Sequence, residues 1–214
     1  MSTSTRWTLV VLAVVVTLGV ALWMQLDRDG STGVQGQASA RDHRDADTRE
    51  ALAEPRARAD LEPCPPDGHG EGPPKLRGIT VDCAGNGSRV DVAKALAGRP
   101  VVLNLWAYWC APCAKELPAM AEYQRRVGPA AMVVTVHQDE NESAALLRLA
   151  ELGVRLPTLQ DGRRLIAAAL QVPNVMPATV VLRPDGSVAE ILPRSFASAD
   201  EIAAAVDPQI GVPG

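Results

Sequence analysis

The chain has 214 residues, enough for one ordinary domain with additional segments. Its 21 basic and 25 acidic residues give a formal net charge of −4 at pH 7, and the two signs are interspersed. Because no basic face results, the composition argues against nucleic acid as a partner.

The first predicted element is an apolar helix over residues 7–26. This segment has no charged residue and about the length needed to cross a bilayer, with a tryptophan near each end, where such rings settle at the interface. Arg6 precedes it and Asp27 follows. By the positive-inside rule we expect residues 1–6 to be cytoplasmic, residues 7–26 to be a single-pass signal anchor in the cell membrane, and the rest to be extracytoplasmic.

A cleaved signal peptide is an alternative to a retained anchor. Residues 38–40, Ala-Ser-Ala, have the small-x-small pattern of a cleavage site. They lie well beyond the apolar segment, further than cleavage usually tolerates. A buried core helix is a third interpretation. The first two both export the remainder of the chain.

Residues 27–62 are predicted to be a flexible extracytoplasmic linker. They contain no aromatic residue and few large aliphatic ones, so they cannot bury enough apolar surface to fold alone. A flexible segment of this length spans on the order of 35 Å root-mean-square. Residues 51–60 also have a weak helical pattern.

Cys64 and Cys83 flank a stretch rich in proline and glycine. Four cysteines outside the cytoplasm argue for pairing, and if Cys110 pairs with Cys113, Cys64 is left with Cys83. Closing this loop would contribute roughly 3 kcal/mol by restricting the unfolded chain. We expect a structural disulfide that pins the linker to a strand at 79–82; a second redox-active pair and two unpaired thiols are the alternatives.

Strands and helices alternate in the domain predicted for residues 63–214. Residues 90–98 resemble a short helix closed by a glycine. Residues 100–106 are apolar and β-branched, as in a strand buried on both faces. A helix with apolar residues at helical spacing follows Cys113.

Cys110 and Cys113 lie where this buried strand leads into that helix. At a helix N-terminus, the unpaired backbone N–H groups and the macrodipole favour a thiolate at Cys110. One helical turn brings the sulfur of Cys113 behind that of Cys110, where it can attack a mixed disulfide and release the product. The pattern predicts a thiol–disulfide exchange site with Cys110 attacking and Cys113 resolving.

Further elements follow to the C-terminus. We expect a buried strand at 131–136, a helix at 141–153, a short strand and helix at 158–161 and 163–171, a proline-led strand at 176–182, a hairpin to 187–192, and a last helix that opens with a capping box at 198–201. Their order implies an α/β fold, with a mixed sheet and helices on both faces.

The chain resembles the thioredoxin superfamily, and more closely its TlpA/ResA-like (redoxin) branch, from about Ile79 to the C-terminus. The matching residues are Trp-Cys-x-Pro-Cys at 109–113, Glu116 followed by Pro118, and Val-Met-Pro-Ala-Thr at 175–179. A bare Cys-x-x-Cys is a weak signal, because half a zinc site has the same spacing. Its place between strand and helix makes it specific. The resemblance implies a thioredoxin-like fold with a TlpA/ResA-type insertion.

The same resemblance implies how a substrate is bound. Met176–Pro177 is expected to be a cis peptide bond beside the sulfur of Cys110, with the backbone of Met176 pairing with an incoming polypeptide as an added strand. Trp109 can shield the sulfurs and offer an apolar rim to a partner. The predicted substrate-binding residues are Trp109, Ala111, Pro112, Met176 and Pro177.

Residues around the two sulfurs are expected to tune them. Ala111 and Pro112 offer no side-chain hydrogen bond to a Cys110 thiolate, which favours a reducing or intermediate potential. Glu116 lies one turn past Cys113, where its charge would disfavour thiolate and its carboxylate can take the proton of Cys113. In the family the matching glutamate belongs to the active site. A solvated carboxylate early in the helix is the alternative.

The sequence therefore predicts an exported, membrane-tethered thiol–disulfide oxidoreductase that acts on protein thiols and disulfides, with no cofactor and no metal. The resemblance implies a reductant, for example in cytochrome c maturation, recharged by a membrane thiol-electron carrier. The nearest alternative is an oxidase that introduces disulfides. A copper-delivery module using Cys110, Cys113 and His137 is another, although related copper proteins space their cysteines one residue further apart. A peroxidase and a zinc site have less support.

Overall fold

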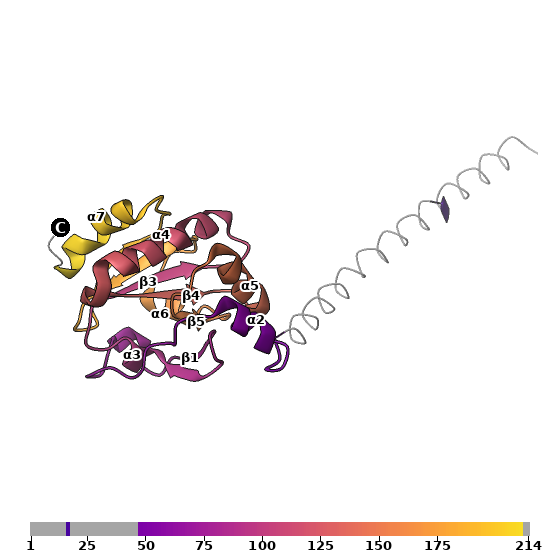
Figure 1. The fold of residues 1–214 in the computed structure, drawn as a ribbon, viewed down its shortest axis with the longest axis horizontal. Helices are drawn as coiled ribbons and strands as arrows, with labels where there is room; N and C mark the ends of the chain where they lie inside the picture. Colours follow the sequence, from indigo (N-terminus) through magenta and orange to yellow (C-terminus); the bar gives the residue numbers. More distant parts are fainter. Residues whose placement is uncertain (1–15, 18–46, 212–214) are drawn as a thin grey trace, which may run out of the picture. The chain divides into compact units, whose positions relative to one another are not determined.

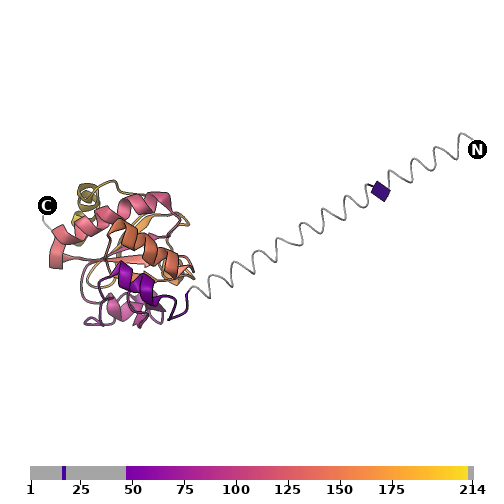
Figure 2. The same ribbon diagram turned by 45° about the vertical axis from the view of Figure 1, so that its right-hand side comes forward.

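The structure is a computed structural model that describes residues 16–17 and 47–211. The chain divides into two units, residues 1–45 and 46–214, and the second unit contains the sheet described below (Figures 1 and 2). The predicted cytoplasmic segment, nearly all of the predicted anchor and residues 27–46 of the predicted linker lie outside the described residues. Among the residues that are described, no helix is long and apolar enough to cross a membrane.

Seven strands of the domain form one mixed sheet in the order β2-β1-β5-β4-β3-β6-β7. The strands are β1 (Thr80–Cys83), β2 (Arg89–Asp91), β3 (Val101–Trp106), β4 (Met132–His137), β5 (Thr158–Gln160), β6 (Ala178–Leu182) and β7 (Val188–Leu192). β3, β4 and β5 run parallel, whereas β6 and β1 flank them in antiparallel pairing. Every residue of β3 and β6 is buried, as expected for strands covered on both faces.

Helices cover both faces of this sheet. They are α2 (Ala53–Ala59), α3 (Val92–Ala95), α4 (Ala111–Val127), α5 (Glu142–Leu152), α6 (Leu165–Leu170) and α7 (Ala199–Ile210), with the 3-10 turns η1 (Pro74–Leu76) and η2 (Gly128–Ala130). The cores show that α4, α5 and α7 pack on one face, and α3, α6 and η1 on the other. Figure 1 shows α4 and α7 on one side of β3 and α3 on the opposite side. The predicted α/β fold is confirmed.

Most predicted elements are found close to their expected bounds. β5 and α6 occupy the predicted strand and helix between α5 and β6. α4 continues through Pro118 without a break. The predicted helix at 90–98 is shorter than expected, because Val90 is buried by pairing with β1, and Asp91 caps α3 by accepting a hydrogen bond from Lys94 N–H at 3.3 Å.

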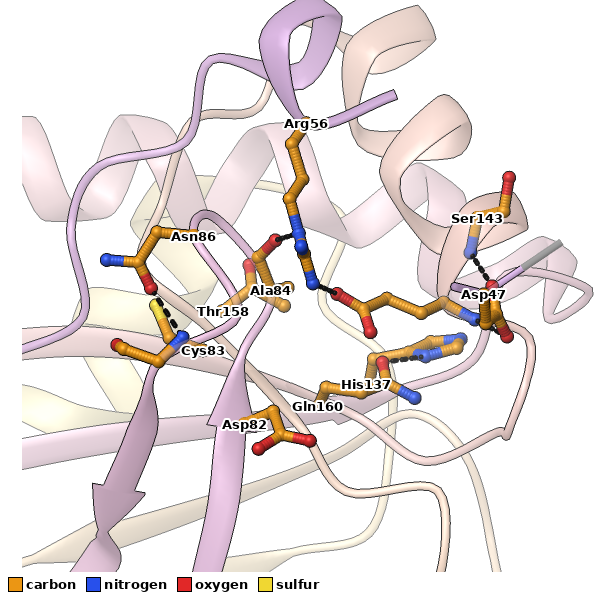
Figure 3. A network of polar contacts seen from close by, with 12 residues as sticks. Asp47, Arg56, Asp82, Cys83, Ala84, Asn86, His137, Ser143, Thr158 and Gln160 are labelled. Carbon is orange, nitrogen blue, oxygen red and sulfur yellow. Dashed lines mark hydrogen bonds and ion pairs between the residues drawn. The ribbon is translucent and has the colours of Figure 1, made fainter. Parts of the chain in front are cut away.

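The predicted linker ends earlier than expected. Leu52, the N-cap residue of α2, and Ala59, its last residue, are buried against Leu146 of α5. The carboxylate of Asp47 accepts hydrogen bonds from two backbone N–H groups at the start of α5, at 2.9 and 3.1 Å (Figure 3). Residues 47–62 therefore belong to the folded unit, which corrects the predicted domain boundary at residue 63.

Candidate active site

Cys110 and Cys113 form a disulfide at the first turn of α4. β3 ends at Trp106, and a short loop leads to Cys110, which is the N-cap residue of α4. The backbone N–H of Cys113 donates to the Cys110 sulfur at 3.2 Å, so the helix N-terminus faces this sulfur. Cys110 is 5% exposed and Cys113 is fully buried. An external sulfur therefore reaches Cys110 first.

An apolar rim lies beside the disulfide. Trp109 is 57% exposed, a large exposed fraction for such a side chain, and Ala111 and Pro112 are exposed next to it. The Met176–Pro177 peptide bond is cis, as the resemblance implies. Met176 packs against the apolar cluster that contains both cysteines. Trp109, Ala111 and Pro112 thus flank the cysteines in the chain, and Met176 packs on the same apolar cluster; that these residues and Pro177 bind substrate stays a prediction.

Glu116 is fully buried beneath the disulfide-bearing turn, so the alternative of a solvated carboxylate is wrong. Its Oε2 accepts a hydrogen bond from Asn104 Nδ2 at 3.1 Å, and its Oε1 accepts one from the Phe196 N–H at 3.3 Å. Burial raises the pKa of Glu116 from 4.5 to about 7, although both hydrogen bonds and the charge of Arg194 oppose the shift. A carboxyl group with this pKa can both accept and release a proton near neutrality.

A row of polar side chains crosses four adjacent strands below α4. Asn104 of β3 is the register partner of Thr179 on β6 and of Thr135 on β4, which in turn pairs with Thr158 on β5. All four are fully buried. Among the described residues, Asn104 Oδ1 and Thr179 Oγ1 have no hydrogen-bond partner, an arrangement that costs free energy. Sequence reasoning missed Asn104, although a polar residue inside an apolar strand was a visible signal.

His137, at the end of β4, lies against the loop that precedes Cys110. Its Nε2 accepts a hydrogen bond from the Tyr108 N–H at 3.4 Å, and its Nδ1 lies 2.8 Å from Gln160 Oε1 (Figure 3). The ring is fully buried, and burial lowers the pKa of His137. Both ring nitrogens are engaged, and the described residues contain no group of three His, Cys, Asp or Glu side chains that could hold a metal ion. The geometry therefore gives the copper hypothesis no support.

The second cysteine pair is also bonded. Cys64 and Cys83 form a disulfide with a Cα–Cα distance of 5.9 Å, which confirms the predicted pairing and excludes two unpaired thiols. Cys83, at the end of β1, is fully buried. The bond ties the segment that follows α2 to β1, the second strand of the sheet.

This fold and this pair of cysteines define a thioredoxin-like protein. The AhpC/TSA family model matches residues 75–191, more than half of the chain, and the chain belongs to that family. Within the thioredoxin superfamily it is a TlpA/ResA-like member.

Relatives and solved structures support this placement. The thiol-disulfide oxidoreductase ResA of Bacillus subtilis is 32% identical over 108 residues, which cover 50% of this chain and 59% of ResA. The chain therefore spans little more than half the length of that relative. A secreted Mycobacterium tuberculosis disulfide oxidoreductase homologous to E. coli DsbE superposes with a TM-score of 0.54 and 26% identity, covering 63% of this chain and 97% of that one. A DsbF homologue from Corynebacterium diphtheriae gives a TM-score of 0.54 and 26% identity, covering 62% of this chain and 85% of that one.

Proposed function

We propose that the protein is a thiol–disulfide oxidoreductase that exchanges the Cys110–Cys113 disulfide with protein substrates. The observation that best supports this proposal is the arrangement of the two cysteines. The Cys110 sulfur lies at the N-terminus of α4, and Cys113 is buried behind it. The oxidoreductase relatives support this proposal.

The reduced protein begins the reaction with the Cys110 thiolate, which attacks a substrate disulfide. One substrate sulfur leaves as a thiolate, and a mixed disulfide with Cys110 forms. Cys113 then loses its proton to Glu116 and attacks the Cys110 sulfur, releasing the second substrate thiolate. Two electrons pass to the substrate, and the protein ends as the disulfide. Glu116 suits this proton transfer because its pKa of about 7 lies close to neutral pH.

The substrate is an extended polypeptide that carries a cysteine. The exposed indole of Trp109 and the neighbouring Ala111 and Pro112 provide an apolar surface for it. The backbone of Met176, before the cis Pro177, can pair with the substrate main chain as an added strand. Because this contact involves only the main chain of the substrate, it can form with a range of protein substrates.

We further propose that the protein acts as a reductant. Neither Ala111 nor Pro112 offers a side-chain donor to a Cys110 thiolate, and a buried Glu116 disfavours added negative charge nearby. Both features destabilise the reduced pair and favour the transfer of electrons to a substrate. An oxidase would need the opposite bias.

The proposed location is the outer side of the cell membrane, with residues 7–26 as a single-pass anchor and the segment up to residue 46 as a tether. The apolar N-terminal segment supports this location, as does the Cys64–Cys83 disulfide, because such bonds persist mainly outside the cytoplasm. A membrane thiol-electron carrier would recharge the pair, and apocytochrome c is a proposed substrate.

The assignment of the two cysteines is tested by trapping. Full-length Cys113→Ser should accumulate mixed disulfides with substrate proteins, because Cys110 attacks and nothing resolves the product. Cys110→Ser should accumulate none. The opposite pattern would overturn the assignment. The midpoint potential of the wild-type pair tests the direction, since a strongly oxidising value would indicate an oxidase.

A further inference from the structure

The two residues before Cys110 rest on the segment that follows β4. The Tyr108 N–H donates to His137 Nε2 at 3.4 Å. The indole Nε1 of Trp109 donates to Asp139 Oδ2 at 3.0 Å. The main chain and the side chain of the loop are thus both attached to β4 and its following turn. Nothing in the exchange chemistry described above uses these two bonds.

Gln160 of β5 connects the two attachment points. Its Oε1 lies 2.8 Å from His137 Nδ1, and its Nε2 donates to the Asp139 carbonyl oxygen at 2.7 Å (Figure 3 shows the contact with His137). The bond to the carbonyl fixes which way the Gln160 amide points. Its Oε1 therefore faces the imidazole as an acceptor, and Nδ1 carries the proton that it accepts.

This arrangement selects one tautomer of His137. With the proton on Nδ1, Nε2 keeps a lone pair, which the Tyr108 N–H needs as its acceptor. A cationic ring would present N–H groups on both sides and lose that bond. Burial keeps the ring neutral, whereas the carboxylates of Asp139 and Asp47 favour the cation. The rings of Trp106 and Tyr108 contact His137 in tilted arrangements, with centroid distances of 4.9 and 6.1 Å.

We propose that His137, in the tautomer set by Gln160, is a positioning residue that holds the Tyr108–Trp109 backbone and thereby the Cys110 sulfur at the N-terminus of α4. This inference rests on the proposed function, because the property that His137 affects is the reactivity of the exchanging Cys110 sulfur. When the acceptor is lost, the Tyr108 N–H is left without its partner and the loop loosens. The Cys110 thiolate then loses part of the helix N-terminal stabilisation, so the pKa of Cys110 rises and the disulfide becomes favoured.

Two substitutions at His137 separate the two ring nitrogens. In His137→Gln the longer amide reaches the position of Nε2 and can accept from the Tyr108 N–H. In His137→Asn the shorter amide reaches only the position of Nδ1. Full-length protein is used for both, and thermal unfolding shows that each variant folds. The Cys110 thiolate is titrated by its ultraviolet absorbance, and the exchange equilibrium constant is measured against dithiothreitol.

For His137→Asn we expect the exchange equilibrium to shift about tenfold towards the disulfide, which corresponds to about 30 mV for this two-electron couple, together with a raised pKa of Cys110. For His137→Gln the exchange equilibrium constant and the acid dissociation constant of Cys110 should both stay within about twofold of the wild-type values, since the acceptor is retained. Equal shifts in the two variants, or no shift in His137→Asn, would overturn the inference.

Gln160→Glu provides a second test that leaves His137 in place. A carboxylate beside Nδ1 favours the imidazolium, which removes the acceptor for Tyr108. The exchange equilibrium should shift towards the disulfide near neutral pH and return towards the wild-type value once the imidazole loses its proton at higher pH. A shift that does not change with pH would contradict the tautomer argument. If wild-type protein itself fails to exchange, the proposed function fails. If wild type exchanges and both His137→Asn and Gln160→Glu behave as wild type does, this inference alone fails.

Discussion

Glu116 combines complete burial with only two hydrogen bonds, one from a side chain and one from the main chain. The unfolded chain would release the proton of this carboxyl near pH 4.5, whereas the folded protein holds it until about pH 7. Between these values the folded state binds more protons than the unfolded state. Stability must therefore fall as the pH rises through this window.

Glu116→Gln tests this linkage in the oxidised protein, in which the cysteines do not titrate. Between about pH 4 and about pH 8, wild type should lose about 3 kcal/mol more of its unfolding free energy than the variant, because only wild type must bury a charge. Urea unfolding at a series of pH values measures the difference. Parallel curves would mean that the carboxyl group ionises without penalty.

Asn104→Leu removes the side-chain donor to Glu116. Because that hydrogen bond favours the charged carboxylate, its loss should raise the pKa of Glu116 further. The pH at which Cys113 resolves a mixed disulfide half-maximally should rise accordingly, as measured by rapid mixing with a model disulfide.

Thr179→Val is the matched control for this prediction. It removes the unpartnered hydroxyl of the neighbouring register position without changing either hydrogen bond to Glu116. The pH profile should stay unchanged, and stability should rise by up to about 1 kcal/mol, since a buried unpaired group is replaced by a methyl. A shifted profile in this control would show that the polar row acts as a whole.

For the single residues of the candidate site, the sequence predicted which residues take part but not which partners surround them. Cys110, Cys113 and the proline at 177 were recognisable because motif and neighbouring elements agree. The burial of Glu116 was not predictable, because one of its partners is the main chain of Phe196, 80 residues further on. The same holds for His137, whose proposed role depends on Gln160 from another strand.

α2 is the element whose place the sequence failed to predict. Its buried residues are few, so its pattern is too weak to indicate a packed helix. The surface on which α2 packs belongs to α5, some 90 residues later, and no local pattern in the sequence indicates that the two helices are in contact. In contrast, β3, β4 and β6 are mostly apolar and β-branched, a pattern that indicates buried strands without knowledge of their partners.

The attachment of α2 centres on Arg56. Its guanidinium pairs with Glu142 of α5 at 2.9 Å and donates to the Ala84 carbonyl oxygen at 3.1 Å (Figure 3). Arg56→Met should destabilise the domain by about 3 kcal/mol, because Glu142 is left buried without its counterion. Arg58→Met, at an exposed position of the same helix, should change stability by less than about 0.5 kcal/mol. Urea unfolding compares the two, and equal effects would show that the ion pair does not hold α2.

For the molecule as a whole, the Cys64–Cys83 disulfide fastens the N-terminal part of the folded unit to the sheet. It closes a loop with a sequence separation of 19. Cys64→Ala/Cys83→Ala should lower the unfolding free energy by roughly 3 kcal/mol, because the unfolded chain gains the freedom that the bond removes.

The same double variant examines whether this bond is only structural. The exchange equilibrium constant of Cys110 and Cys113 should stay at the wild-type value. A changed constant would indicate that the second pair takes part in the exchange. Mild reduction of wild type should open the 110–113 bond before the 64–83 bond.

The complete order of the strands in the sheet could not be predicted from the sequence either. Alternating strands and helices imply a mixed sheet, and the apolar runs identify its centre. That β1 and β2 extend the sheet beside β5 depends on pairing between residues 82–83 and 159–160, far apart in the chain. Local patterns carry no information on such pairing, since short strands look alike whatever their neighbour.

The chain has four tryptophans, and the folded unit from residue 46 onward contains two of them, Trp106 and Trp109. One is buried under α4 and the other is 57% exposed, and both lie within four residues of Cys110. Because a disulfide can quench a nearby indole, we expect the intrinsic fluorescence of this unit to rise when the Cys110–Cys113 bond is reduced. The domain thus carries its own optical probe, with which each exchange reaction can be followed without a dye.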